Sequence, residues 1–149
     1  ERYRGGVIPA PSKLGGSENS IDEALRSLTG EVDAAMSEIA FHKALGAIWE
    51  FIALVNKYVD DEAPWTLAKE KKDEKLDTVL WTISRSIGAV SILISPFMPA
   101  SAEEIWRRLG SPKTFFSLRL SHSGDKELIK PGQISSKGSS LFPRYEEKS

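Results

Sequence analysis

The stretch that decides the fold runs from Phe41 to Trp65 and reads FHKALGAIWEFIALVNKYVDDEAPW. Its apolar side chains recur at steps of three and four residues, which places them on one face of an amphipathic helix. The stripe consists of Phe41, Leu45, Ile48, Ile52, Val55 and Val59, and Ala44, Phe51 and Tyr58 widen it. The helix should end near Asp60–Asp61, because Pro64 pushes the residue before it out of helical geometry.

The same period appears upstream and downstream of this stretch. Ser20 and Glu23 have the spacing of a capping box and predict a helix start, and an apolar stripe follows it to Ile39. Residues 67–75 indicate a solvated turn or a short helix, and an apolar stripe predicts a helix over 76–94. Proline near the start and Gly110 at the end predict a short helix over about 99–109. The apolar run from 79 to 94 contains Arg85 and is short for a bilayer, so it predicts a buried helix.

These patterns together predict an all-α fold, an antiparallel helix bundle with an extended C-terminal tail. We expect an extended entry segment over 1–18, a helical domain over 19–112 and a tail over 113–149. Facing stripes predict that the bundle core includes Ile48, Ile52, Val55, Ile83, Ile87 and Val90.

The tail changes character from the helical region. Residues 115–120 predict a short strand or extended run, and the sequence after Gly124 is too polar to fold alone. We expect this part either to be poorly ordered or to lie against the helices. The apolar group Leu141-Phe142-Pro143-Arg144 should dock onto another surface, and we expect the tail to pack back toward a neighbouring domain.

Composition excludes several kinds of site. The 149-residue chain has no cysteine, only two histidines (His42 and His122) and a formal net charge of −1. Disulfides, thiolate metal sites and histidine-rich metal sites are therefore unavailable, and we expect no metal site and no catalytic residue. Any nucleic acid must be recognised by a few placed side chains and not by bulk charge.

One segment combines the chemistry for such recognition. Pro64 fixes the backbone in front of Trp65, whose exposed indole would give an unpaired base a surface for stacking. Asn56 offers a donor and an acceptor to a base edge, and four lysines would reach phosphates: Lys57, Lys69, Lys71 and Lys72. The residues alone leave open that Trp65 plugs the end of the bundle and that the lysines are merely solvated.

The segment NKYVDDEAPW at 56–65 resembles the end of the second main helix in the anticodon domain of methionyl-tRNA synthetases. The likeness extends over nearly the whole chain from Val7 onward, and Ala-Pro-Trp at 63–65 is its most specific part. It includes FHKALGAIWEF at 41–51, ISPFMP at 94–99, EIWRRLG at 104–110, KP at 130–131 and LFPR at 141–144.

This resemblance implies a function. Family members attach methionine to its tRNA with ATP in a separate class I catalytic domain, and their helical domain reads the anticodon CAU. The resemblance assigns stacking on the first anticodon base to Trp65, the lining of the same pocket to Pro64 and rejection of wrong RNA to Asp60. It also places an asparagine and an arginine contact before residue 1, so the chain is expected to begin partway through the domain.

We therefore expect a cytoplasmic tRNA-binding part of a methionine–tRNA ligase. It should have Trp65, Pro64, Asn56, Lys57 and Asp60 as anticodon-binding residues. The expected partners are this tRNA and the catalytic domain of the same chain, and no membrane. ATP, and a zinc ion if the parent holds one, belong to the catalytic part, and no cofactor is expected here. Two alternatives remain: the anticodon domain of another class I synthetase, and a helical protein-interaction module.

Overall fold

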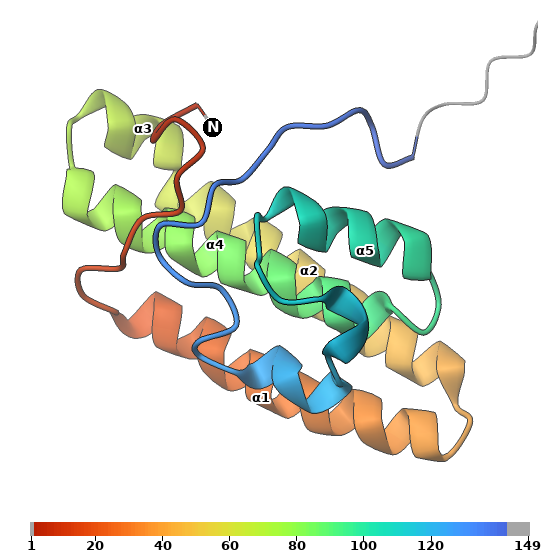
Figure 1. Ribbon diagram of the computed structural model, residues 1–149. Coiled ribbons are helices and arrows are strands. Elements are labelled where there is room, and N and C mark those ends of the chain that lie inside the picture. Colours follow the sequence, from red (N-terminus) through yellow and green to blue (C-terminus); the bar gives the residue numbers. More distant parts are fainter. Residues whose placement is uncertain (1, 143–149) are drawn as a thin grey trace, which may run out of the picture.

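The computed structural model describes residues 2–142, and this part of the chain is helical without a β-strand. Five α-helices and two short 3₁₀ helices follow one another along the chain (Figure 1). They are α1 (Gly16–Ser37), α2 (Phe41–Glu62), α3 (Pro64–Lys69), α4 (Asp73–Ile94), α5 (Pro99–Arg108), η1 (Phe115–Ser117) and η2 (Leu120–Gly124). The predicted all-α fold and its four main helices are confirmed. The segment predicted as a solvated turn or short helix contains the end of α3 and the start of α4.

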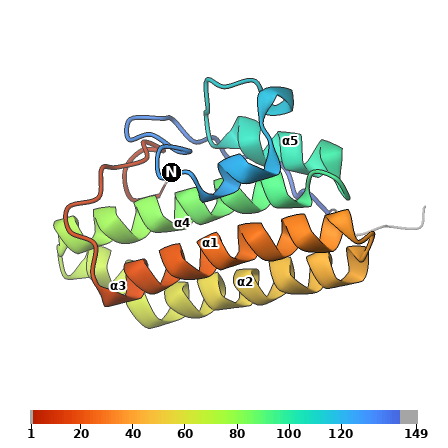
Figure 2. The same ribbon diagram turned by 90° about the horizontal axis from the view of Figure 1, so that it is seen from below.

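Helix α4 lies at the centre of the molecule. The α1–α2 hairpin packs on one side of it, and α5 with both terminal segments packs on the other (Figures 1 and 2). Helices α1 and α4 run in the same direction and α2 runs against both, as expected for sequential helices with short connections. The short helix α3 reverses the chain at the end of the bundle where α2 ends and α4 begins.

The start of α1 differs from the prediction based on Ser20 and Glu23. The helix begins at Gly16, and the Glu18 carboxylate accepts a hydrogen bond of 2.8 Å from the backbone N–H of Gly15. Ser20 is already inside the helix and donates to the carbonyl of Gly16. Glu18 makes the carboxylate half of a capping box, and glycine before the helix provides no side-chain oxygen for the other half. The Ser-x-x-Glu spacing therefore marked the wrong turn.

The core prediction is right for α2 and wrong for one residue of α4. Ile48 and Val55 are buried, and Ile52 is partly buried. In α4, Ile83 and Val90 are only partly buried, and Ile87 is 41% exposed.

The physical reason lies in the polar residues of α4. Its buried side carries Thr78, Thr82 and Ser86, and the hydroxyl groups of Thr82 and Ser86 donate to the carbonyls four residues before them. A hydroxyl that is satisfied within its own helix can be buried at little cost. The apolar stripe therefore did not identify the most buried side of this helix.

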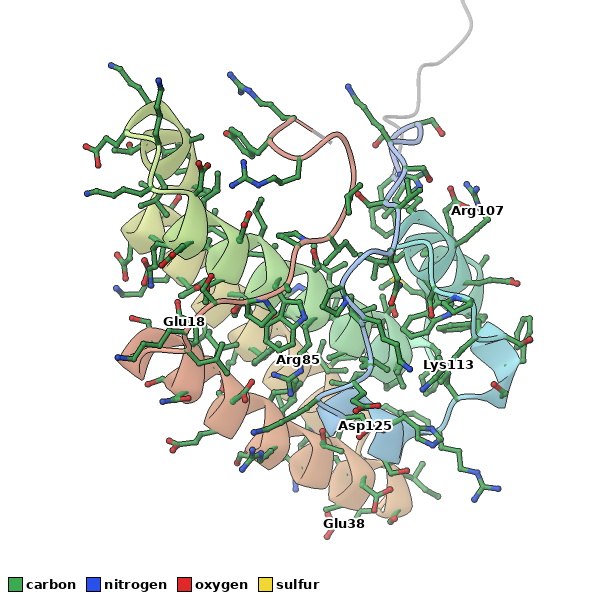
Figure 3. The ribbon with its side chains drawn as sticks, turned by 60° about the vertical axis from the view of Figure 1, so that its left-hand side comes forward. Glu18, Glu38, Arg85, Arg107, Lys113 and Asp125 are labelled. Carbon is green, nitrogen blue, oxygen red and sulfur yellow. The ribbon has the colours of Figure 1, made fainter. Side chains whose placement is uncertain are left out.

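Arg85 lies at the centre of this polar side and is buried. Its guanidinium forms an ion pair with Asp22 of α1 and donates weaker bonds, each of 3.4 Å, to the carbonyls of Asp125 and Gly124. It also lies 5.6 Å from the centre of the Trp81 ring, within the range of a cation–π contact. Figure 3 shows Arg85 between α1 and α4, beside the segment that carries Asp125. One side chain thus joins two helices to the tail.

The tail packs against the helices, which confirms one of the two outcomes expected for it. Leu128 and Ile129 are almost fully buried, and a Cβ at Gly88 would lie 2.9 Å from the Ile129 side chain. The glycine in α4 therefore allows the tail to approach the helix. The short strand or extended run expected over 115–120 is right only for Leu118 and Arg119, whose backbone is extended. The short helix η1 forms the first part of that segment, and its Phe115 ring packs against Trp106.

The two terminal segments meet each other. Val7 and Ile134 form an isolated antiparallel bridge, and the Ile8 N–H donates to the carbonyl of Gln133 at 2.8 Å. The predicted entry segment is further fixed by Arg4, whose guanidinium bonds Asp73 and Asp77 at the start of α4. Both ends of the helical region therefore lie on the same side of α4. Of the predicted plug, Phe142 is exposed, and Pro143 and Arg144 lie outside the described residues.

Helix α4 has the length and composition of a membrane span, and it is the one such helix in residues 2–142. However, 67% of its most apolar window is buried inside the bundle. This agrees with the prediction of a buried helix over the apolar run.

The corrected core predicts a difference between two isoleucines. In the 149-residue chain, Ile48→Ala should lower the free energy of unfolding by about 2–5 kcal/mol, because it empties a fully buried site. Ile87→Ala should cost about 1 kcal/mol or less, since its side chain already contacts solvent. Urea unfolding followed by circular dichroism measures both, and equal losses would show that the α4 face is assigned wrongly.

The Arg85 ion pair predicts strong coupling between two substitutions. Arg85→Met should cost about 3–5 kcal/mol, because it leaves the Asp22 carboxylate buried without its partner. The double variant with Asp22→Leu should recover most of this loss, since no unpaired charge remains. Unfolding midpoints of the two single variants and the double variant give the coupling. Additive effects would exclude the ion pair as the reason for the loss.

Candidate nucleic-acid interface

The turn between α2 and α3 places an aromatic ring in solvent. Ala63 has φ 42° and ψ 66°, a left-handed conformation that glycine usually supplies at a helix end. Pro64 follows as the first residue of α3, where its missing N–H costs nothing and its fixed φ suits the helix. Pro64 is buried, and so is Leu67. The backbone that carries Trp65 is therefore held on both sides.

Trp65 is 50% exposed, which confirms the prediction for its indole. Tryptophan is highly buried on average, whereas half of this residue remains available to a partner. The alternative in which Trp65 plugs the end of the bundle is excluded, since the buried residues of α3 are Pro64 and Leu67.

The other predicted site residues lie on the last turns of α2. Asn56, Lys57 and Asp60 are all exposed. Asn56 and Asp60 are four residues apart and so share one face of the helix. Lys57 already has an ion-pair partner. Its ammonium lies 2.6 Å from the Asp61 carboxylate, and this hydrogen bond raises the pKa of Lys57. Lys57 is therefore less free to bind a phosphate than the sequence suggested.

Three more lysines lie at or beyond the end of α3. Lys72 pairs with Glu70 at 2.8 Å. Lys69 and Lys71 are exposed, and no ion pair within residues 2–142 holds either of them. Lys69 follows Trp65 by four residues in α3 and so lies on the same side of that helix. Of the three lysines, Lys69 and Lys71 are thus the two without an ion pair within residues 2–142.

A cluster that the sequence analysis did not identify lies beneath this turn. The buried Glu18 carboxylate accepts hydrogen bonds from Tyr58 Oη at 2.7 Å and from Lys75 Nζ at 2.8 Å. Lys75 Nζ also lies 3.0 Å from the Glu62 carboxylate, at the last residue of α2. The cluster joins α1, α2 and α4 at the end of the bundle that carries α3, where Figure 3 shows Glu18. The spacing of Gly15 and Glu18 would have been the only signal for it in the sequence.

The cluster changes the acidity of its members. Burial by itself would raise the pKa of Glu18, but the hydrogen bonds from Lys75, Tyr58 and the Gly15 N–H together lower this pKa to about 2. Burial and the bond to Glu18 raise the pKa of the Tyr58 hydroxyl well above its usual range. Burial opposes the charge of Lys75, and the two carboxylates outweigh it and raise the pKa of Lys75. Glu18 and Lys75 therefore stay charged at neutral pH, and Tyr58 keeps its proton.

The described residues do not offer a place for a metal. No group of three or more His, Asp or Glu side chains within residues 2–142 is arranged to hold an ion. The features of this region are an exposed indole, exposed polar side chains and two lysines without an ion pair in the described residues, which suit binding.

Comparison with known proteins agrees with this geometry. Residues 18–137 match the family model described as the anticodon-binding domain of tRNA ligase. The chain is 37% identical over 154 residues to a methionine–tRNA ligase of Caldanaerobacter subterraneus, with 98% of the chain and 23% of that protein covered. It is 32% identical over 154 residues to the enzyme of Streptomyces coelicolor, with 99% and 29% covered. The chain thus spans less than a third of the length of these relatives.

A solved structure has the same fold. The apo form of Mycobacterium tuberculosis methionyl-tRNA synthetase superposes with a TM-score of 0.86 at 26% sequence identity, over 99% of this chain and 30% of that one.

The low pKa of Glu18 predicts a loss of stability in acid. Because the folded-state pKa lies below the ordinary value, the contribution is present above about pH 4.5 and is lost as pH falls toward 2. Its size is on the order of 3 kcal/mol. Glu18→Gln should therefore flatten the fall in urea midpoint between about pH 5 and pH 3. Glu23→Gln on the exposed side of α1 is the control, and identical acid profiles for both variants and the wild type would contradict the assignment.

Proposed function

Because this chain belongs to the family of anticodon-binding domains of tRNA ligases, we propose that it binds the anticodon loop of a methionine-specific tRNA. The relatives that support the choice of amino acid are methionine–tRNA ligases. The proposed anticodon is CAU, which is the methionine anticodon named by the family resemblance.

The observation that carries the proposal is the exposed indole of Trp65 behind a buried proline. A rigid, half-exposed ring gives an unstacked base a surface for stacking without the entropy cost of ordering a flexible side chain. Such stacking contributes about 1–3 kcal/mol per base. Pro64 would act by fixing the backbone in front of Trp65, since its own ring is buried.

The side chains around Trp65 divide between base reading and phosphate binding. Asn56 would contact a base edge, because its amide offers both a donor and an acceptor. Lys69 and Lys71 would bind phosphates, since no ion pair within the described residues competes for them. Asp60 would disfavour wrong loops by placing a negative charge near their backbone. Lys57 would contribute less than these lysines, because Asp61 already holds it.

The whole protein would be a methionine–tRNA ligase in the cytoplasm, with ATP and any zinc ion in a separate catalytic part. The described residues do not fit a metal, and the proposal includes no step that involves ATP or zinc here. This domain contributes binding energy at the anticodon loop. That energy favours the reaction when it orients the acceptor end of the correct tRNA at the remote active site.

The proposal predicts selective damage from Trp65→Ala. Binding of a CAU stem-loop to the intact ligase should weaken by about 5- to 150-fold, the equivalent of one lost base stack. The free energy of unfolding should change by less than about 0.5 kcal/mol, because the ring is outside the core. Fluorescence anisotropy of a labelled stem-loop measures the first quantity and urea unfolding the second.

Trp49→Ala is the matched control, because this indole is 53% exposed on α2 at a distance from the turn. It should leave stem-loop binding unchanged. A stem-loop with another class I anticodon distinguishes the specificities, and preference for it would assign the chain to a different ligase. If neither loop binds the wild type and Trp65→Ala changes nothing, the region is a protein-interaction surface.

A further inference from the structure

The helix that carries Trp65 has a locally unfavourable backbone on each side. Ala63 precedes it with φ 42° and Lys71 follows it with φ 56°, and these are two of the three non-glycine residues with positive φ in residues 2–142. A left-handed conformation costs a side-chain-bearing residue about 1–2 kcal/mol. Such a conformation persists only where surrounding contacts hold it.

The end of α2 is unfavourable for a second reason. Asp60, Asp61 and Glu62 place three carboxylates in its last turn. The C-terminal end of a helix carries partial negative charge and favours cations, so this arrangement is the reverse of the usual one. Local rules are most often broken at functional positions, where contacts elsewhere compensate. Two such exceptions therefore coincide directly before Trp65.

Each of two carboxylates in this turn has a lysine partner, but the partners differ. Asp61 pairs with Lys57 on its own helix at 2.6 Å, so this pair stays within α2. Glu62 pairs with Lys75 of α4 at 3.0 Å, and the same ammonium lies 2.8 Å from Glu18 of α1. The Glu62 side chain is 16% exposed, so the pair is shielded more than an ordinary surface ion pair. It connects the residue before Ala63 to two other helices.

The Glu62 carboxylate is not needed to neutralise the buried cluster. Glu18 keeps Lys75, Tyr58 and the Gly15 N–H as partners when Glu62 is absent. Loss of the Glu62 charge therefore leaves no buried carboxylate unpaired, and the cost to folding should be small. What changes is the attachment of the end of α2 to α4.

From these contacts we propose that Glu62, held by Lys75, is a positioning residue. It fixes the left-handed turn at Ala63 and so sets the orientation in which Trp65 meets an anticodon base. The expected effect on RNA binding rests on the proposed function. The expected effect on the orientation of Trp65 rests on the geometry alone. A residue with only a structural role would change stability and leave the orientation of Trp65 and the choice of anticodon unchanged.

The test uses Glu62→Gln, which removes the charge and keeps the shape of the side chain. The control is Glu104→Gln, which removes the pairs of Glu104 with Arg107 and Arg108 on α5. Helix α5 lies at the opposite end of α4 from α3 (Figure 1). All measurements are made well below the lowest unfolding midpoint of the set.

The structural arm is ¹⁹F NMR of the 149-residue chain labelled with 5-fluorotryptophan, which reports on each of its four tryptophans. Trp65→Phe identifies the resonance of Trp65. In Glu62→Gln this resonance should shift or broaden while that of Trp106 stays in place, and Glu104→Gln should leave the Trp65 resonance unchanged. An unchanged Trp65 resonance in Glu62→Gln overturns the proposal.

The RNA arm compares the affinities of the intact ligase for the CAU stem-loop and for a stem-loop with one changed anticodon base. Glu62→Gln should reduce the ratio of the two affinities by about tenfold, the equivalent of part of one base stack. A ratio equal to that of the wild type overturns the proposal. If the wild type itself does not distinguish the loops, the proposed function fails, and the NMR arm still decides whether Glu62 orients Trp65.

Discussion

The bundle depends on the buried guanidinium of Arg85. A charged group in this position is tolerable only with good partners, because removing it from water costs several kcal/mol. Asp22 supplies the opposite charge, the carbonyls of Gly124 and Asp125 at the end of η2 accept further bonds, and Trp81 covers the cation. Since these partners come from α1, α4 and the tail, satisfying one side chain requires all three to be in place. Apolar packing alone would hold the helices with less restriction on their relative position.

A second charged cluster fixes α1 and α4 at the end of the bundle. Lys75 and Glu18 repeat the arrangement of Arg85 and Asp22, a cation on α4 and a carboxylate on α1. Because these two helices run in the same direction, two such contacts fix both their spacing and their register. The second cluster also includes Tyr58 and Glu62 of α2. The turn that carries Trp65 thus lies beside the cluster that joins three helices. These contacts should make the turn rigid, which suits a surface that must select an RNA loop by its shape.

Much of the fold was predictable because most helices of the bundle bury an apolar face. Apolar stripes identified α1 and α2, and Pro99 and Gly110 marked the ends of α5. The proline at 64 correctly indicated where α2 ends. The residues alone left open whether the indole at 65 is exposed, and the family resemblance favoured exposure. The errors have physical causes: α4 buries threonine and serine hydroxyls that are satisfied within the helix, so its apolar stripe did not mark its most buried side. The tail folds because Leu128 and Ile129 use a surface that only the finished bundle provides.

The sequence by itself determined the helices, the position of the turn at 63–65 and the kind of chemistry that the turn can perform. These features depend on contacts between residues that are close in the chain, so periodicity and proline were sufficient to reveal them. Only the tertiary structure decided which charged side chains pair with one another across helices. Glu18, Glu62 and Lys75 are separated by 44 and 13 positions in the sequence, and they form one cluster because three helices bring them together. Pairing across such distances leaves no local pattern, since it depends on the packing of whole helices. The pair of Lys57 with Asp61 is an exception, because the two residues are four positions apart on α2 and their pairing is local.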